Sequence, residues 1–156
     1  EEQEGQWWLG EGLLIEQWVK DLAQPSKFNN DVPRCPFALQ AYEAGDVKTV
    51  VTDDLWSDVL YECARFESKK HKVTMFFDYE YQSLEDRCHA LNRFFTEVNK
   101  DIWLLAFHAG TEGVVFVQRW SDLENAAAKL EKLGYYENYD PDDYKRHILM
   151  RKQRSV

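Results

Sequence analysis

Glycine and proline are scarce in this sequence, with 7 and 4 copies in 156 residues. A long flexible linker would need more of both, and we find no internal repeat and no low-complexity tract. Hydrophobic residues make up 44% of the chain and aromatic residues 15%, which excludes an intrinsically disordered protein. We therefore expect a single globular domain over residues 1–156.

Cysteine and long apolar runs are also limited. The three cysteines are an odd number without a Cys-x-x-Cys pair, which favours a reducing compartment over a disulfide scaffold. No apolar stretch approaches the ~20 residues that a membrane-spanning helix needs. The acidic start, with Glu1, Glu2 and Glu4, differs from the basic start of a secretory signal peptide. These features predict a cytoplasmic protein that makes no contact with a membrane.

Basic residues are outnumbered, 19 against 28 acidic residues, which gives a formal charge of −9. Binding to nucleic-acid phosphates needs a basic face, so nucleic acid is not an expected partner. The sequence lacks a phosphate-binding glycine loop, a dinucleotide fingerprint and a nucleophile elbow. His71, His89 and His147 have no ligand spacing with one another or with cysteine. We therefore expect neither a metal site nor a cofactor.

Apolar residues at helical spacing predict four helices, over about 12–23, 55–66, 84–98 and 121–133. Pro25 ends the first of them. The third has the clearest pattern, because its apolar positions are 4, 3, 4 and 3 residues apart. Those positions are Leu84, Cys88, Leu91, Phe95 and Val98.

Runs of β-branched and apolar residues predict strands at 47–51, 72–79, 102–108 and 114–119, with a last edge strand at 147–151. The order α-β-α-β-α-β-β-α-(β) predicts a mixed sheet of four to five strands with about four helices, in an α/β or α+β fold. The crossovers favour parallel pairing of the first three strands, and a hairpin adds an antiparallel fourth. We expect the nearly all-apolar third strand at the sheet centre.

Cys35 is the one cysteine that lies outside a predicted helix, in a loop between Arg34 and Pro36. Pro36 favours an extended backbone at Cys35, and the positive charge of Arg34 favours a thiolate. Cys35 is therefore a candidate reactive thiol. The alternative, which is the commoner case, is a loop thiol packed under Phe37.

His108 ends the apolar third strand, and loops that follow strand ends are where open α/β sheets bind ligands. Asp78, followed by Tyr79, ends the second strand, so parallel strands would place it at the same edge of the sheet. A histidine there is a candidate general base or ligand contact, and it could also be a partner of the Cys35 thiol. A histidine bonded to the loop backbone and a solvated strand-end aspartate are the structural alternatives.

Several segments of the chain together form a pattern that a known family shares. They are Trp18-Val19, Cys35-Pro36-Phe37-Ala38, Gly45-Asp46-Val47, Phe77-Asp78-Tyr79 and Ala106-Phe107-His108, with Leu84, Leu91 and Phe94. Over roughly residues 14–109 the sequence thereby resembles the bacterial domain-of-unknown-function family 1415. It differs from the family at Arg34, where an apolar residue is usual, and at Ala109, where proline commonly follows the histidine. The resemblance implies a bacterial or phage-encoded relative and supports a site at Cys35 and His108, without naming a reaction.

Two hypotheses for the function follow. In the first, the protein binds or acts on a small molecule at the edge of the sheet, with Cys35 as nucleophile or redox thiol, His108 as base and Asp78 as orienting group. The expected ligand contacts are Arg34, Phe37 and Tyr79. In the second, the chain is a non-catalytic interaction module whose protein partner binds Trp7, Trp8 and the charged ends of the sequence.

Overall fold

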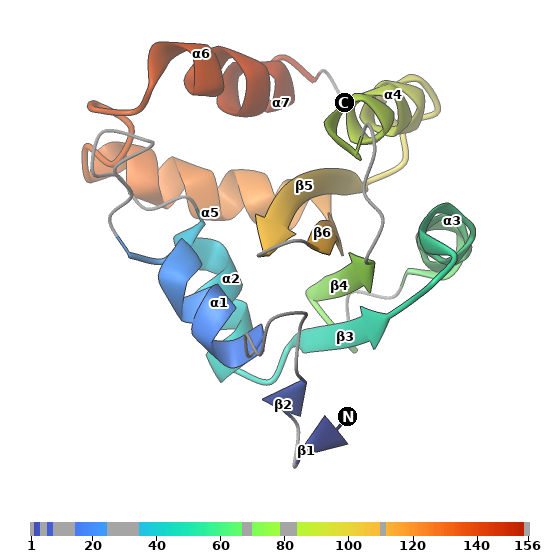
Figure 1. Ribbon diagram of the computed structural model, residues 1–156. Coiled ribbons are helices and arrows are strands. Elements are labelled where there is room, and N and C mark those ends of the chain that lie inside the picture. The colour runs from blue at the N-terminus through green and yellow to red at the C-terminus, as the bar shows by residue number, and fades with distance from the viewer. Residues whose placement is uncertain are drawn as a thin grey trace.

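The computed structural model describes residues 2–3, 6–7, 15–24, 35–66, 70–78, 84–109 and 112–154. These residues form an α+β fold around a mixed four-stranded sheet of order β3-β4-β6-β5 (Figure 1). The strands are β3 Val47–Val51, β4 Val73–Asp78, β5 Trp103–Ala109 and β6 Glu112–Gln118. A separate two-stranded ribbon joins β1 Glu2–Gln3 to β2 Gln6–Trp7.

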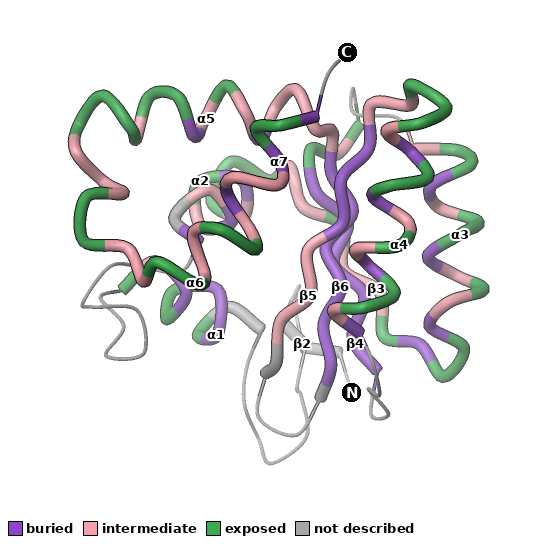
Figure 2. Tube along the Cα trace, turned by 90° about the horizontal axis from the view of Figure 1, so that it is seen from above, coloured by how far each residue is buried: buried purple, intermediate pink, exposed green. Residues whose placement is uncertain are grey.

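Helices cover both faces of the sheet (Figure 2). One face carries α3 and α4, and the other carries α1, α2, α5 and a C-terminal helix that consists of α6, the π-helical segment η3 and α7. The bounds are α1 Ile15–Leu22, α2 Pro36–Glu43, α3 Leu55–Arg65, α4 Leu84–Glu97, α5 Trp120–Lys132, α6 Pro141–Asp143, η3 Tyr144–Leu149 and α7 Met150–Lys152.

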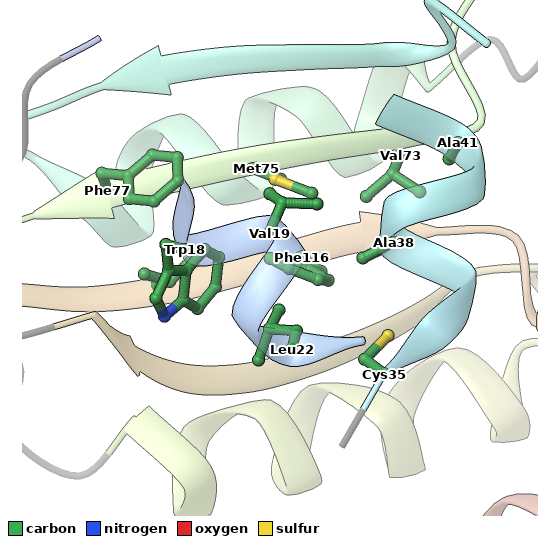
Figure 3. Packing of buried hydrophobic residues seen from close by; sticks show 11 residues of the cluster. Trp18, Val19, Leu22, Cys35, Ala38, Ala41, Val73, Met75, Phe77 and Phe116 are labelled. Carbon is green, nitrogen blue, oxygen red and sulfur yellow. The ribbon is translucent and has the colours of Figure 1, made fainter. Parts of the chain in front are cut away.

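Two apolar clusters hold these layers together. Successive side chains of a strand point to opposite faces, so alternate residues of the fully buried β4 serve different clusters. Met75 and Phe77 pack with α1 and α2, whereas Phe76 packs with α3 and α4. The Trp18 ring of α1 stands edge-on against Phe77, 5.8 Å away, and Phe116, 5.7 Å away (Figure 3). Such aromatic pairs contribute roughly 0.5–1.5 kcal/mol each beyond the area that they bury.

Much of the predicted element order is confirmed. The mixed sheet is present, β3 and β4 are parallel, and β5 and β6 form the expected antiparallel hairpin. In α4 the predicted apolar face is buried at Leu84, Cys88 and Phe95, while Val98 lies past the end of the helix and is 52% exposed.

The segment after Cys35 is a helix rather than a loop. Pro36 stands in the first turn of α2, where the missing N–H of proline costs no hydrogen bond and its fixed φ suits a helix. Gly45, with φ +75°, follows the end of α2 and lets the chain turn into β3. Cys35 is therefore the N-cap residue of a helix.

The third predicted strand, β5, lies at the edge of the sheet and not at its centre. The hairpin folds β6 back between β4 and β5, so β4 pairs with β6 and not with β5. The predicted parallel pairing of the second and third strands is therefore wrong, although β4 and β5 run the same way, because each is antiparallel to β6.

The predicted edge strand at 147–151 is wrong, because these residues are helical. Ile148 and Arg151, which lie one helical turn apart, are the buried residues of this segment. Asp140 is the N-cap of the C-terminal helix. Its carboxylate accepts hydrogen bonds from the backbone amides of Asp142 and Asp143, both 3.0 Å away.

The free edge of β5 receives hydrogen bonds from side chains instead of from another strand. Asn92 of α4, 1% exposed, bonds both backbone groups of Leu104: its Nδ2 donates to the carbonyl at 2.9 Å, and its Oδ1 accepts from the amide at 2.7 Å. Arg154, just after α7, donates to the carbonyls of Ile102, 3.1 Å away, and of Lys100. Side chains thus protect the first part of this edge.

We expect Asn92→Leu to lower the free energy of unfolding by at least about 2 kcal/mol, because the substitution leaves a buried N–H and a buried C=O of Leu104 without partners. Urea denaturation measures the effect. Arg93→Ala, at the exposed neighbouring position of the same helix, should change stability by less than about 0.5 kcal/mol. Equal stability of the two variants would contradict the role of Asn92 in covering the strand edge.

Candidate ligand-binding cavity

A cavity of about 200 Å³ lies beside the second half of β5, between this strand, α5 and the C-terminal helix. The start of α2 and the first turn of α4 complete its wall. One part of the wall is apolar and the rest carries hydroxyl, thiol, imidazole and charged groups. The apolar side chains are Phe37, Leu105, Ala106, Phe107, Leu123, Ala126, Ala127, Leu130 and Ile148. The polar ones are Cys35, Glu85, Tyr135, Tyr136, Tyr139, Asp143, His147 and Arg151.

Cys35 is held in this wall by the ends of two helices. It is the N-cap of α2, and its backbone amide donates to the carbonyl of Leu22, the last residue of α1, at 2.9 Å. The thiol lies at the margin of the apolar cluster and is 6% exposed (Figure 3). Burial raises the pKa of Tyr135, and the neighbouring Tyr139 and Cys35 raise it further. Cys35 and these phenols are therefore close enough to interact.

Arg151 brings a buried positive charge to the cavity. The residue is 3% exposed, and its Nε donates to a carboxylate oxygen of Glu124 on α5 at 2.8 Å. Its backbone carbonyl accepts from the indole of Trp120 at 3.0 Å, which fixes α7 against α5. Burial raises the pKa of Tyr136, and the charge of Arg151 and a hydrogen bond to it offset part of that rise.

A tyrosine cluster lies beside this guanidinium. The ring of Tyr136 lies edge-on to those of Tyr135, Tyr139 and Tyr144, with centroids 5.1, 5.5 and 5.9 Å away. These residues come from the turn between α5 and α6 and from the start of η3. The hydroxyl groups of Tyr135, Tyr136 and Tyr139, which line the cavity, add neutral hydrogen-bonding capacity to its wall.

The two acidic side chains of the cavity wall, Glu85 and Asp143, are both paired with Arg146. Arg146 donates to Glu85 at 3.0 Å and also bonds Asp143. Next to it, burial lowers the pKa of His147, so this imidazole is neutral at pH 7. The ring of His147 stands 6.1 Å from that of His89 on α4.

The structure places two of the six predicted site residues, Cys35 and Phe37, in one cavity. Asp78 is elsewhere: it ends β4, is 8% exposed and shares the face of Phe76, which packs against α3 and α4. His108 of β5 and Asp78 of β4 both pair with Gly113, from opposite sides of β6. Their backbones therefore lie at the same end of the sheet, as predicted.

The remaining predicted contacts, Arg34 and Tyr79, lie outside the described residues, as does the side chain of His108. The pairing of Cys35 with His108 therefore stays a prediction. The wall residues that the sequence pattern did not reveal are the tyrosines and Arg151. A strand at 147–151 would point Ile148 to the opposite side from His147 and Arg151, whereas the helix brings all three side chains to the cavity.

Within the described ranges, no three His, Cys, Asp or Glu side chains are grouped so that they could hold a metal ion. No helix in this part of the chain has the length and apolar character needed to cross a bilayer. The chain matches no protein-family model, no curated protein and no solved structure. The resemblance to domain-of-unknown-function family 1415 stays a prediction from the motifs.

The three thiols should differ in reactivity toward iodoacetamide in the native protein at pH 8. Burial raises the pKa of Cys63 and of Cys88 to about 12, so neither should be alkylated until the protein unfolds. Cys35, which lines a cavity, should react first. Mass spectrometry of each cysteine peptide measures the order, and labelling of Cys63 or Cys88 before Cys35 would overturn it.

The same measurement tests the predicted activation of Cys35. If His108 promotes the thiolate, Cys35 should be alkylated well below pH 8.5, and His108→Ala should slow that reaction about ten-fold or more at pH 7. An unchanged pH profile in the variant would show that the two residues do not act together.

Proposed function

We propose that this protein binds a small molecule in the cavity beside β5, and that Cys35 contacts the bound compound. The observation that supports the proposal most strongly is the composition of the wall: nine apolar side chains line the space together with eight side chains that carry hydroxyl, thiol, imidazole or charged groups. Binding sites for small molecules typically have this composition, because apolar area supplies affinity and a few polar contacts fix orientation.

The volume limits the size of the ligand. An apolar cavity of about 150 Å³ accepts a benzene ring, and pockets for drug-sized compounds measure about 300–1,000 Å³. A cavity of about 200 Å³ therefore suits a compound of one ring, or a short alkyl chain, with one polar group.

The cavity includes Cys35, as the predicted small-molecule site does, but it lies beside the second half of β5 and not at the ends of the strands. Phe107 lines the cavity and is followed directly by His108. A catalytic role for the pair would require the imidazole to reach the thiol within ~3 Å or through one water molecule. Binding needs only the wall, so we propose binding as the function.

We also infer that the protein works in a reducing compartment such as the cytoplasm. No disulfide joins Cys35, Cys63 or Cys88 in the described part of the chain, and all three are buried. An oxidising compartment favours disulfide pairing, whereas a reducing one preserves isolated thiols. The alternative function, a protein-interaction module, depends on Trp7 and Trp8. Residue 8 and the side chain of residue 7 lie outside the described residues, so that hypothesis stays a prediction.

Filling the cavity should abolish ligand binding. Ala126 and Ala128 are two residues apart on α5, but only Ala126 lines the cavity, and Ala128 faces solvent. We expect Ala126→Trp to lose binding and Ala128→Trp to keep it. Saturation-transfer NMR with benzoate, benzamide, benzyl alcohol and benzylamine provides the readout, and circular dichroism checks that both variants fold.

Two results would contradict the proposal. One is that none of the four compounds binds the unchanged protein at millimolar concentration. The other is that a compound binds Ala126→Trp and Ala128→Trp equally well, because the binding would then take place outside this cavity.

A further inference from the structure

We infer that the cavity is specific for monocarboxylic acids, and that the guanidinium of Arg151 and the hydroxyl of Tyr136 hold the carboxylate of the ligand. This inference rests on the proposed function and names the chemical class of the ligand. It is carried by one buried donor without a partner, by the charges around that donor, and by the neighbouring phenol.

The unpaired donor is Nη2 of Arg151. This atom is buried and has no hydrogen-bond partner within the described part of the chain, although Nε of the same side chain is bonded to Glu124. A buried N–H without an acceptor costs roughly 1–3 kcal/mol, and more when the group is charged. Arg151 lines the cavity, so an acceptor on a ligand that displaces the atoms covering Nη2 would remove this penalty.

Glu124 fixes the guanidinium and leaves its charge effective toward the cavity. The Arg151 side chain is 4% exposed, whereas that of Glu124 is 20% exposed, so water screens the carboxylate more than the guanidinium. Guanidinium presents planar N–H donors that match the two oxygens of a carboxylate. With Nε bonded to Glu124 and another N–H bonded to Tyr136, the unpaired Nη2 remains for a second carboxylate.

Tyr136 supplies the second donor. A guanidinium can only donate, so the hydrogen bond between Arg151 and Tyr136 uses the phenol oxygen as acceptor and leaves the hydroxyl proton for another partner. Burial also raises the pKa of Tyr136, which keeps the group protonated at neutral pH. A carboxylate could thus accept one charge-assisted and one neutral hydrogen bond.

A cationic ligand would find no unpaired carboxylate among the described residues that line this cavity. The two acidic residues of the wall, Glu85 and Asp143, are both engaged by Arg146. His147, beside them, is neutral and lies near the second imidazole of His89. The donors at Arg151 and Tyr136 therefore decide the polarity of the ligand, and the apolar wall accepts its carbon skeleton.

Titration calorimetry at pH 7.5 compares benzoate, benzamide and benzylamine, which share one ring and differ in their polar group. We expect benzoate to bind at least about ten-fold more tightly than benzamide, and benzylamine not to bind. Tyr136→Phe removes only the hydroxyl and should weaken benzoate about ten-fold, with a smaller loss for benzamide. Tyr144→Phe is the matched control, because Tyr144 belongs to the same ring cluster but does not line the cavity.

Arg151→Gln should lower the affinity for benzoate more than about ten-fold. If Arg151→Gln does not fold, Tyr136→Phe alone provides the test. Equal affinity for benzoate and benzamide, or tighter binding of benzylamine, would overturn the carboxylate specificity while the proposed function stands. Preference for benzoate with no effect of Tyr136→Phe would overturn the assignment of the polar contacts. Failure of all three compounds to bind would contradict the proposed function itself.

Discussion

Strand β5 has β6 on one side only, so the backbone groups along its other edge need partners from outside the sheet. Asn92 pairs with Leu104 on that edge, and Arg154 bonds the carbonyls of Lys100 and Ile102. The first contact places α4 against the strand. The second draws the end of the C-terminal helix back to the beginning of the same strand.

The cover that these side chains provide stops at Leu104, and the cavity begins there. Leu105, Ala106 and Phe107, the next residues of the strand, line the cavity instead of receiving a further strand. The helices that close it on the other sides are held together by their own contacts, such as the ion pair of Arg151 with Glu124. The cavity is thus a consequence of how the strand edge is protected. Part of its polar wall comes from the elements that protect the edge, namely Glu85 of α4 and Asp143, His147 and Arg151 of the C-terminal helix.

The local pattern of apolar residues predicts most of the helices and strands of the fold. Apolar spacing predicted α4 well, because buried positions of an amphipathic helix recur every three to four residues. The position of β5 could not be predicted in the same way, since a hairpin can add its second strand on either side of the first. An apolar edge strand that helices cover has the same composition as a central strand.

Predicting the candidate site from the sequence succeeded only in part. Cys35 and Phe37 were found because Cys-Pro-Phe is locally distinctive, although Pro36 was interpreted as a loop residue and not as the start of a helix. Arg151 and Tyr136 gave no local signal. Their role depends on the packing of α7 against α5, and only the folded chain reveals that contact.

Hydrogen exchange at the Leu104 amide tests most directly whether side chains protect the edge of β5. This amide points away from β6, and its acceptor is the side chain of Asn92. We predict that it exchanges as slowly as the amide of Phe116, which lies in the central strand β6. Exchange at the rate of a solvent-exposed strand edge would show that α4 does not cover β5, and edge protection could then not be the origin of the cavity.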